Sequence, residues 1–176
     1  MSRFVMNKKD KLHEVADRVV SLASQLKKII VTAESCTGGL VAKAITDIPG
    51  SSYCFSHGFV TYSDTAKNTL LGINSLLIKD NGAVSKIVAE RMAKNTLRDN
   101  TVDISVAITG IAGPTGGTLE KPVGTVWLAW GYYIDNQIII DTQHYCFNGD
   151  RNTIRFESAI EALIGLEKRM KKCNSV

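Results

Sequence analysis

The sequence predicts an α/β fold, specifically a single-domain three-layer α/β/α sandwich with a mixed, mostly parallel sheet. Stretches with helical spacing of apolar residues alternate along the chain with short β-branched runs. This alternation is typical of helices packed on both faces of a sheet. Late in the chain, two strand-like runs flank Asp135-Asn136-Gln137, a pattern that predicts an antiparallel hairpin and therefore a mixed sheet.

The length and composition are those of one ordinary globular domain. The chain has 176 residues, 44% of them hydrophobic and 22% charged, with a formal net charge of +4. We therefore expect one domain over residues 1–176, and composition excludes disorder as its main state. The small basic excess forms no stripe interleaved with aromatic residues, so no nucleic-acid partner is expected. The densest basic cluster is interpreted as a solvated helix end and comprises Lys168, Arg169, Lys171 and Lys172.

The cysteines and the apolar runs indicate a cytoplasmic protein. None of the four cysteines forms a Cys-x-x-Cys pair, so we expect reduced thiols and no zinc site. Residues 1–12 are too charged for a secretory leader. Uncharged runs such as residues 122–134 (13 residues) and 104–119 (16 residues) are too short for a membrane span, which needs about 20.

The first third of the chain reads as helix, strand, tight turn and helix. Apolar residues three and four apart over 8–27 predict an amphipathic helix. Ile29–Val31 predicts a short buried strand, and the small polar segment 32–39 predicts a turn. A second helix follows from Leu40.

The middle of the chain predicts a strand and two further helices. Phe59–Tyr62 is the strand candidate. Ser63 is predicted to cap a helix that carries Lys67 and ends at Gly72. Ser85 is predicted to cap the next helix.

The last third predicts three strands and a long helix. Residues 103–109 form the strongest strand pattern, followed by a glycine-rich loop that extends through Pro122. Residues 125–133 and 138–147 are the strands of the hairpin. A final helix is expected to start at Asp150.

Polar clusters follow three of the predicted strands. Ligands of open α/β sheets bind outside the carboxyl ends of the strands, so the three clusters are expected to meet in one crevice. They are Glu34-Ser35 with Gly38-Gly39, Tyr62 with Lys67, and Thr109 with the glycine loop.

Ser35 has two interpretations. At the start of a helix it lies near backbone N–H groups without intrahelical partners, which can stabilise an oxyanion or hold a phosphate, and this favours a nucleophile. Alternatively, Ser35 or Thr37 simply caps the helix. The neighbouring Cys36 is a rival nucleophile, although a small buried thiol is the expected outcome.

A serine nucleophile needs a base, and the three histidines are poorly placed for that role. His13 lies on the first helix, His57 precedes a strand and His144 lies inside one. Lys67, one helical turn after Tyr62, is the better base if its ammonium is desolvated enough to lose a proton. The alternative is a solvated helix lysine.

The loop over residues 110–117 has the spacing Gly-x-x-Gly-x-x-Gly-Gly, which matches neither the dinucleotide fingerprint nor the P-loop. Its glycines, including Gly110 and Gly113, allow backbone N–H groups to approach an anion, and Lys121 can add charge. The alternative is a flexible connector.

Five segments in this order resemble the CinA C-terminal domain family over about residues 10–170. They are Thr32–Gly39, Gly58–Ser63, Gly82–Ser85, Thr109–Pro114 and Lys121–Val126. The enzymatic members of this family are nicotinamide mononucleotide (NMN) amidohydrolases, and the resemblance is to the stand-alone bacterial ones. It therefore implies hydrolysis of the NMN carboxamide to nicotinate mononucleotide and ammonia, which returns the nucleotide to NAD synthesis.

The resemblance also implies residue roles. Ser35 matches the nucleophile and Lys67 the general base, while Tyr62 is expected to relay protons and Thr109 to bind the amide or the tetrahedral oxygen. With backbone N–H groups near Gly38 as the oxyanion site, the candidate substrate-binding residues are Glu34, Thr37, Gly38, Gly39, Gly110, Gly113 and Lys121. No cofactor, metal or membrane contact is implied, and a homo-oligomer is expected.

Two other functions are compatible with the same residues. The first is a serine–lysine amidase or esterase with another substrate. The second is a catalytically silent nucleotide-binding module linked to competence or DNA damage.

Overall fold

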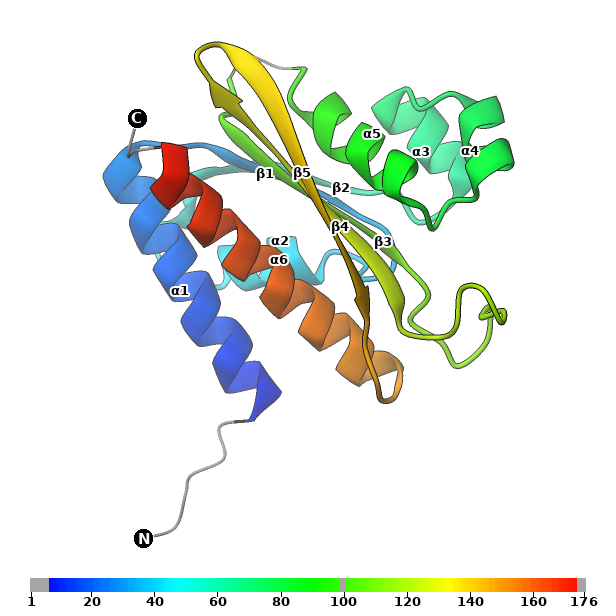
Figure 1. The fold of residues 1–176 in the computed structure, drawn as a ribbon. Coiled ribbons are helices and arrows are strands. Elements are labelled where there is room, and N and C mark those ends of the chain that lie inside the picture. The colour runs from blue at the N-terminus through cyan, green and yellow to red at the C-terminus, as the bar shows by residue number, and fades with distance from the viewer. Residues whose placement is uncertain (1–6, 99–100, 174–176) are drawn as a thin grey trace, which may run out of the picture.

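The computed structural model describes residues 7–98 and 101–173 and contains one mixed five-stranded sheet in the order β2-β1-β3-β4-β5 (Figure 1). The strands are β1 (Ile30–Glu34), β2 (Phe55–Val60), β3 (Ile104–Gly110), β4 (Thr125–Ile134) and β5 (Gln137–Cys146). The helices are α1 (Lys8–Leu26), α2 (Leu40–Thr46), α3 (Asp64–Leu71), α4 (Ser75–Asn81), α5 (Lys86–Thr96) and α6 (Arg151–Cys173), with a 3₁₀ turn at Ser51–Tyr53.

Helices cover both faces of the sheet. Figure 1 shows α1, α2 and α6 on one side and α3, α4 and α5 on the other. β1 pairs in parallel with β2 and β3, whereas β4 is antiparallel to both β3 and β5. Only β4 therefore runs against the others, and the predicted three-layer fold with a mixed, mostly parallel sheet is confirmed.

The two central strands are buried on both faces. Ile30, Val106 and Ile108 pack towards α1 and α6, whereas Ala33 and Ala107 pack towards α5. Strands covered by helices on both faces are buried along their length, and accordingly all of β1 and the first six residues of β3 are buried. No helix of the described residues is long and apolar enough to cross a membrane.

Most predicted element ends hold, but the strand predicted over Phe59–Tyr62 begins and ends four and two residues earlier, as β2, and one predicted cap is wrong. The hydroxyl of Ser63 accepts a hydrogen bond from the backbone N–H of Ala66 at 3.0 Å, so Ser63 caps α3 as predicted. Ser85 does not cap α5, because its hydroxyl instead donates to the carbonyl of Gly82 at 2.8 Å. The short helix α4 has no sequence-based prediction, since seven residues are too few to display a full helical period.

The hairpin between β4 and β5 confirms the predicted turn. Asp135 and Asn136 have φ values of 48° and 60°. Asp and Asn tolerate this left-handed region better than most residues, which explains why a two-residue turn forms at this point.

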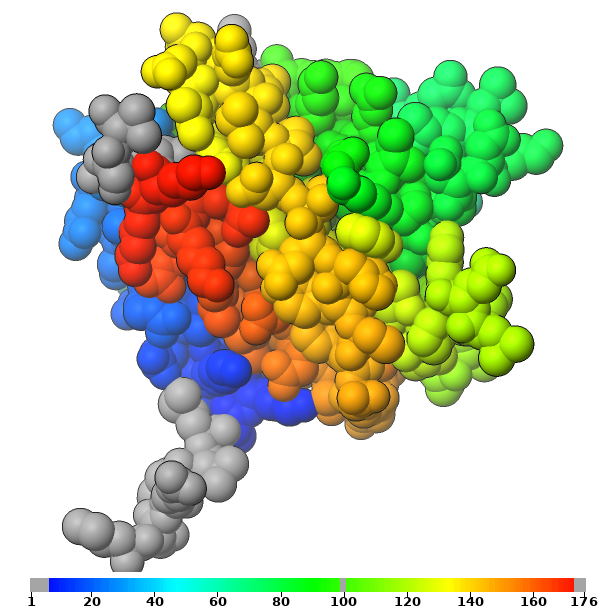
Figure 2. Space-filling model, in the orientation of Figure 1, coloured from blue at the N-terminus to red at the C-terminus, as the bar shows by residue number. Residues whose placement is uncertain are grey.

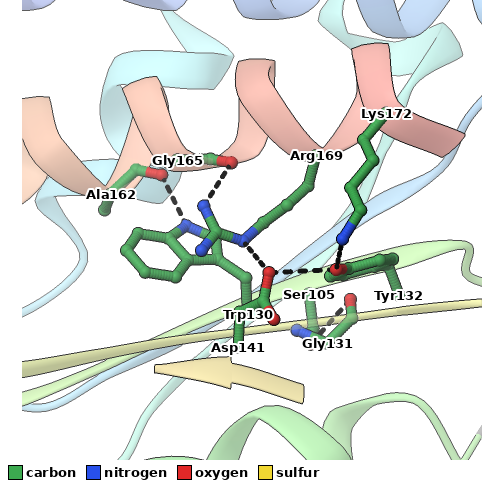
Figure 3. Close-up of polar contacts among 9 residues, drawn as sticks. All are labelled: Ser105, Trp130, Gly131, Tyr132, Asp141, Ala162, Gly165, Arg169 and Lys172. Carbon is green, nitrogen blue, oxygen red and sulfur yellow. Dashed lines mark hydrogen bonds and ion pairs between the residues drawn. The ribbon is translucent and has the colours of Figure 1, made fainter. Parts of the chain in front are cut away.

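The expectation of a solvated cluster at the end of α6 is wrong for Arg169. Its guanidinium lies 3.8 Å from the ring centroid of Trp130, and its Nε is 3.2 Å from Asp141 Oδ2 on β5 (Figure 3). The hydroxyl of Tyr132 donates to the same carboxylate oxygen at 2.9 Å. Helical periodicity alone cannot reveal this, because the acidic partner lies 28 residues upstream in an edge strand.

The contacts that Arg169, Asp141 and Trp130 make connect α6 to the sheet. The indole N–H of Trp130 donates to the carbonyl of Ala162 at 2.9 Å, and a β-carbon at Gly165 would overlap the indole ring (Figure 3). The close approach therefore requires glycine at this point of α6. The Arg169–Asp141 pair then connects the C-terminal half of the helix to β5.

Replacing Asp141 with alanine is expected to lower the free energy of unfolding by about 1–2 kcal/mol. The substitution leaves the mostly buried guanidinium of Arg169 without its carboxylate. Urea unfolding followed by circular dichroism measures the change.

The matched control is Asp47→Ala, which removes a pair with Lys43 that is exposed on both sides. Exposed pairs contribute little, so this variant should lose less than about 0.5 kcal/mol. Equal losses for the two variants would show that the α6 cluster has no special role in stability.

Candidate active site

Ser35 begins the turn between β1 and α2 at the carboxyl edge of the sheet. Its backbone N–H donates to the carbonyl of Ile108 at 2.9 Å, which extends the β1–β3 pairing by one residue. Gly38 and Gly39 then adopt φ values of 61° and 89°, which explains the two glycines. The predicted strand, tight turn and helix are confirmed, and Ser35 is left 8% exposed.

One backbone N–H group of the turn is already engaged in a hydrogen bond within the turn itself. The N–H of Gly38 donates to the carbonyl of Ser35 at 3.0 Å and is therefore not available as the oxyanion donor expected from the sequence. Within the described part of the chain, the N–H groups of Cys36 and Thr37 donate to no backbone carbonyl.

Glu34 caps α2, which excludes the capping interpretation of Ser35 and Thr37. Its two carboxylate oxygens accept hydrogen bonds from the backbone N–H groups of Val41 (3.1 Å) and Ala42 (2.8 Å). The N-cap of the helix is Gly39, which has no side chain to cap it. Because Glu34 is fully buried and both oxygens are engaged, its position suits it to hold the turn rather than to face a ligand.

Lys67 lies in the interior beside Ser35. Its Nζ is 3.3 Å from Ser35 Oγ and donates to the carbonyl of Thr61 at 3.1 Å. Only 1% of Lys67 is exposed, so the alternative of a solvated helix lysine is wrong. The short helix α3, which starts at the Ser63 cap, carries this side chain into the sheet edge.

Burial lowers the pKa of the Lys67 ammonium below its ordinary range. Asp64, whose Oδ1 is 3.8 Å from Nζ, is the main group that acts in the opposite direction. Asp64 is largely exposed, so water screens its charge. Burial beside the hydroxyl of Ser35 therefore shifts this amine towards its neutral form.

The rival nucleophile and the rival bases are not organised for catalysis. Cys36 is buried, and burial raises the pKa of its thiol to about 12, so it stays protonated. The Nδ1 of His57 pairs with its neighbour Ser56 at 2.8 Å. His13 and His144 lie on exposed parts of α1 and β5.

Thr109 is buried at the end of β3, and its hydroxyl donates to the carbonyl of Ala83 at 2.8 Å. A hydroxyl has one proton to donate and two lone pairs that accept. With its proton engaged, Thr109 can accept a hydrogen bond from a substrate, but it is not arranged to donate one to an oxyanion.

Tyr62 faces Arg151 instead of the buried lysine. The guanidinium of Arg151 donates through Nη2 to the hydroxyl of Tyr62 at 2.8 Å and through Nη1 to the carbonyl of Gly113 at 2.7 Å. Tyr62 is 60% exposed, so much of its side chain is open to solvent. Arg151 thus connects the segment after β2 with the glycine-rich loop.

A second arginine of α6 reaches the Ser35 turn. Arg155 donates through Nη2 to the carbonyl of Thr37 at 2.6 Å, whereas the hydroxyl of Thr37 is buried without a partner in the described residues. Arg151 and Arg155 are four residues apart and share one face of the helix. That spacing is visible in the sequence, but nothing in the sequence indicates that this face meets the turn.

The glycine-rich loop packs closely against β4 at its start and projects beyond the sheet further on. A β-carbon at Gly110 would lie 2.8 Å from the carbonyl oxygen of Thr125, so this position requires glycine. Lys121 donates to the carbonyl of Asn81 at 3.3 Å, which directs it to the end of α4. Figure 2 shows the loop as a yellow-green projection, and among the described residues no three His, Cys, Asp or Glu side chains cluster as a metal site.

The chain belongs to the family of the CinA C-terminal domain, whose model matches residues 12–170. A CinA-like protein of Chlorobaculum tepidum is 48% identical over 157 residues, which are 88% of this chain and 37% of that protein. The nicotinamide-nucleotide amidohydrolase PncC of Enterobacter agglomerans is 44% identical, with 87% of this chain and 92% of that enzyme covered. This chain thus spans about a third of the first relative and nearly all of the second.

A solved structure has the same fold. The competence/damage inducible protein CihA of Agrobacterium tumefaciens superposes with a TM-score of 0.85 at 38% identity and covers 97% of this chain and 99% of its own. The fold described above is therefore shared with a structure determined for a relative.

Replacing Glu34 with alanine is expected to lower the free energy of unfolding by about 2 kcal/mol, because two backbone N–H groups of α2 lose their acceptor. Thermal unfolding of the purified variant measures the loss.

The comparison variant is Glu14→Ala, which removes an exposed carboxylate that pairs with Arg18 on α1. It should change stability by less than about 0.5 kcal/mol. A Glu34 variant as stable as the Glu14 variant would contradict the capping role.

Proposed function

We propose that this chain hydrolyses the carboxamide of NMN to nicotinate mononucleotide and ammonia. The observation that carries the proposal is the buried pair of Lys67 and Ser35, with Nζ and Oγ 3.3 Å apart. The match to a nicotinamide-nucleotide amidohydrolase along 92% of that enzyme supports the choice of substrate.

The first step is attack by Ser35. A neutral lysine has two N–H donors and one lone pair, and one donor is engaged by the carbonyl of Thr61. The lone pair then accepts the proton of the Ser35 hydroxyl as Oγ bonds to the carboxamide carbon. The carbonyl π bond opens, its oxygen becomes an anion and Lys67 becomes an ammonium.

The oxyanion needs hydrogen-bond donors close to Ser35. The backbone N–H groups of Cys36 and Thr37 follow the nucleophile directly and have no backbone acceptor in the described residues. We assign the oxyanion to these donors in place of the N–H of Gly38. Arg155, bound to the carbonyl of Thr37, holds this part of the turn in position.

The second step releases ammonia. The Lys67 ammonium returns its proton to the amide nitrogen as the C–N bond breaks, which leaves a nicotinoyl ester on Ser35. We assign Thr109 to accept an N–H of the carboxamide, since its own proton is held by Ala83. Water then attacks the ester with Lys67 as the base, and as the C–O bond to Ser35 breaks, the Lys67 ammonium returns that proton to Oγ and the acid is released.

Substrate binding is assigned to the exposed groups around the pair. The pyridine ring of NMN carries a positive charge, and the exposed side chain of Tyr62 suits a cation–π contact with it. Arg151 fixes that tyrosine against the glycine-rich loop. Lys121 and the loop remain our candidates for the 5′-phosphate, and the product would return to NAD synthesis.

Ser35→Ala is expected to lower kcat/KM for ammonia release from NMN by about 1,000-fold or more, because no other nucleophile replaces the hydroxyl. Lys67→Arg should be almost as damaging, since arginine stays protonated near pH 7. Ser56→Ala, an exposed serine on β2, is the control and should keep full activity.

The same assay with nicotinamide, nicotinamide riboside and NAD separates the competing functions. Turnover of another amide but not of NMN would indicate a different serine–lysine amidase. Binding of NMN without any turnover would indicate a silent nucleotide-binding module.

The pH dependence should report Lys67. Because the neutral amine is the active form, kcat/KM is expected to rise with pH through the lowered pKa of Lys67. Asp64 raises that pKa, so Asp64→Asn should move the rising limb to lower pH by about 0.5–1 unit.

Asp17→Asn, at an exposed position of α1, is the control and should leave the limb unchanged. A limb that stays in place in the Asp64 variant, or a flat profile with chemistry rate-limiting, would contradict the role of Lys67 as the base.

A further inference from the structure

A second polar cavity lies on the other helical layer, between the C-terminal end of α3 and the helices α4 and α5. Its volume is about 560 Å³, large enough for a small organic molecule. It is lined by Gly72, Ile73, Asn74, Leu77, Asp80, Asn81, Arg91, Asn95 and Arg98.

Two arginines stand on the α5 side of this cavity. Arg91 lies on α5 and Arg98 follows the C-terminal end of that helix, and both side chains line the cavity. Within residues 7–98 and 101–173, neither guanidinium makes a hydrogen bond or an ion pair with the protein. Each therefore presents its full set of N–H donors to whatever enters the cavity.

The wall opposite Arg98 is formed by a glycine. Gly72 ends α3 with a φ of 62°, and a β-carbon there would lie only 2.8 Å from Nη1 of Arg98. A side chain at this position would therefore displace the guanidinium. Because glycine has no side chain, Arg98 has room to lie along the loop after α3.

The asparagines around the cavity are held by the backbone. The side-chain N–H of Asn95 donates to the carbonyl of Leu71 at 2.7 Å, and that of Asn81 to the carbonyl of Leu77 at 2.9 Å. Asn74 uses its side-chain oxygen to accept from the N–H of Leu76 at 2.8 Å, which leaves its NH₂ group as a donor. Among the described residues of the lining, Asp80 is the one carboxylate, against the two guanidinium groups of Arg91 and Arg98.

We propose that this cavity binds the phosphoryl group of a small anionic molecule through Arg91 and Arg98. The planar guanidinium matches the oxygens of a phosphate in pairs, and two of them exceed the opposing charge of Asp80. The amide of Asn74 adds a neutral donor at the rim. The cavity lies apart from the Ser35 turn, because none of its lining residues contributes to the hydrogen bonds of that turn.

The proposed ligand would contact the helix that carries the catalytic base. The N–H of Ile73 donates to the carbonyl of Lys67 at 3.3 Å, and that of Gly72 to the carbonyl of Asn68 at 2.8 Å. A ligand that holds the Gly72–Asn74 loop therefore also restrains the end of α3. This gives the site a direct route to the position of Lys67.

The test is the binding of inorganic phosphate and pyrophosphate at constant ionic strength, with chloride as the reference salt. A ligand that binds only the folded chain raises Tm with concentration. We expect such a rise in the wild-type chain and at least a tenfold weaker apparent affinity in Arg91→Gln/Arg98→Gln. Lys94→Gln, on α5 but outside the lining, should bind as the wild type does.

Two further variants identify the site that binds the anion. Asp80→Asn should bind pyrophosphate more tightly, because a repelling charge is removed. Lys121→Gln removes the cation assigned to the 5′-phosphate at the Ser35 crevice and should leave most of the Tm shift intact. A shift that is undiminished in the double variant, or lost in Lys121→Gln, would overturn the proposal.

If the double variant fails to fold, Arg91→Gln is titrated alone and the amide NMR signal of Gly72 is followed. A pyrophosphate-dependent shift of this signal in the wild type, weakened in Arg91→Gln, supports the site. An unmoved Gly72 signal in the wild type would overturn it.

Discussion

The chemistry proposed for this chain depends on keeping one ammonium group away from water. Removing a charged amine from water is unfavourable, and the neutral form relieves that penalty. The Nζ of Lys67 is buried beside the carbonyl of Thr61 and the hydroxyl of Ser35, and the nearby carboxylate of Asp64 is largely exposed. In the neutral amine, one N–H can donate to the carbonyl of Thr61 while the lone pair accepts the proton of the Ser35 hydroxyl.

The rest of the site holds the two partners at that separation. Ser35 is tied to β3 through its backbone, and Glu34 beside it binds the start of α2 with both carboxylate oxygens. Lys67 comes from the opposite side of β1, on a short helix that follows the edge strand β2. Strand pairing therefore sets the distance between nucleophile and base.

The last helix completes this arrangement from the far end of the chain. Arg151 and Arg155 reach the glycine-rich loop and the Ser35 turn from the first turns of α6. The other end of α6 is held by Arg169, which lies over Trp130 and pairs with Asp141 (Figure 3). The cluster around Arg169 thus contributes to the geometry of the Ser35 turn, although the helix between Arg155 and Arg169 is about 20 Å long at 1.5 Å per residue.

Local signals in the sequence were sufficient for the elements and their order. The apolar spacing of α1, the serine cap of α3 and the Asp135-Asn136 turn each act within a few residues, so they are predictable without the fold. The same kind of reasoning was wrong for Ser85 and Arg169 and did not find α4. In these cases the outcome depends on neighbours contributed by other segments.

By itself, the sequence determined the alternation of helices and strands and the placement of polar residues after β1, β2 and β3. It did so because hydrophobic periodicity and turn chemistry are properties of consecutive residues. Only the tertiary structure decided that Lys67 is buried, that Glu34 caps a helix and that two arginines of α6 meet the Ser35 turn. Burial and pairing of charges depend on which surfaces pack together, and residues more than 100 positions apart carry no local record of their contact.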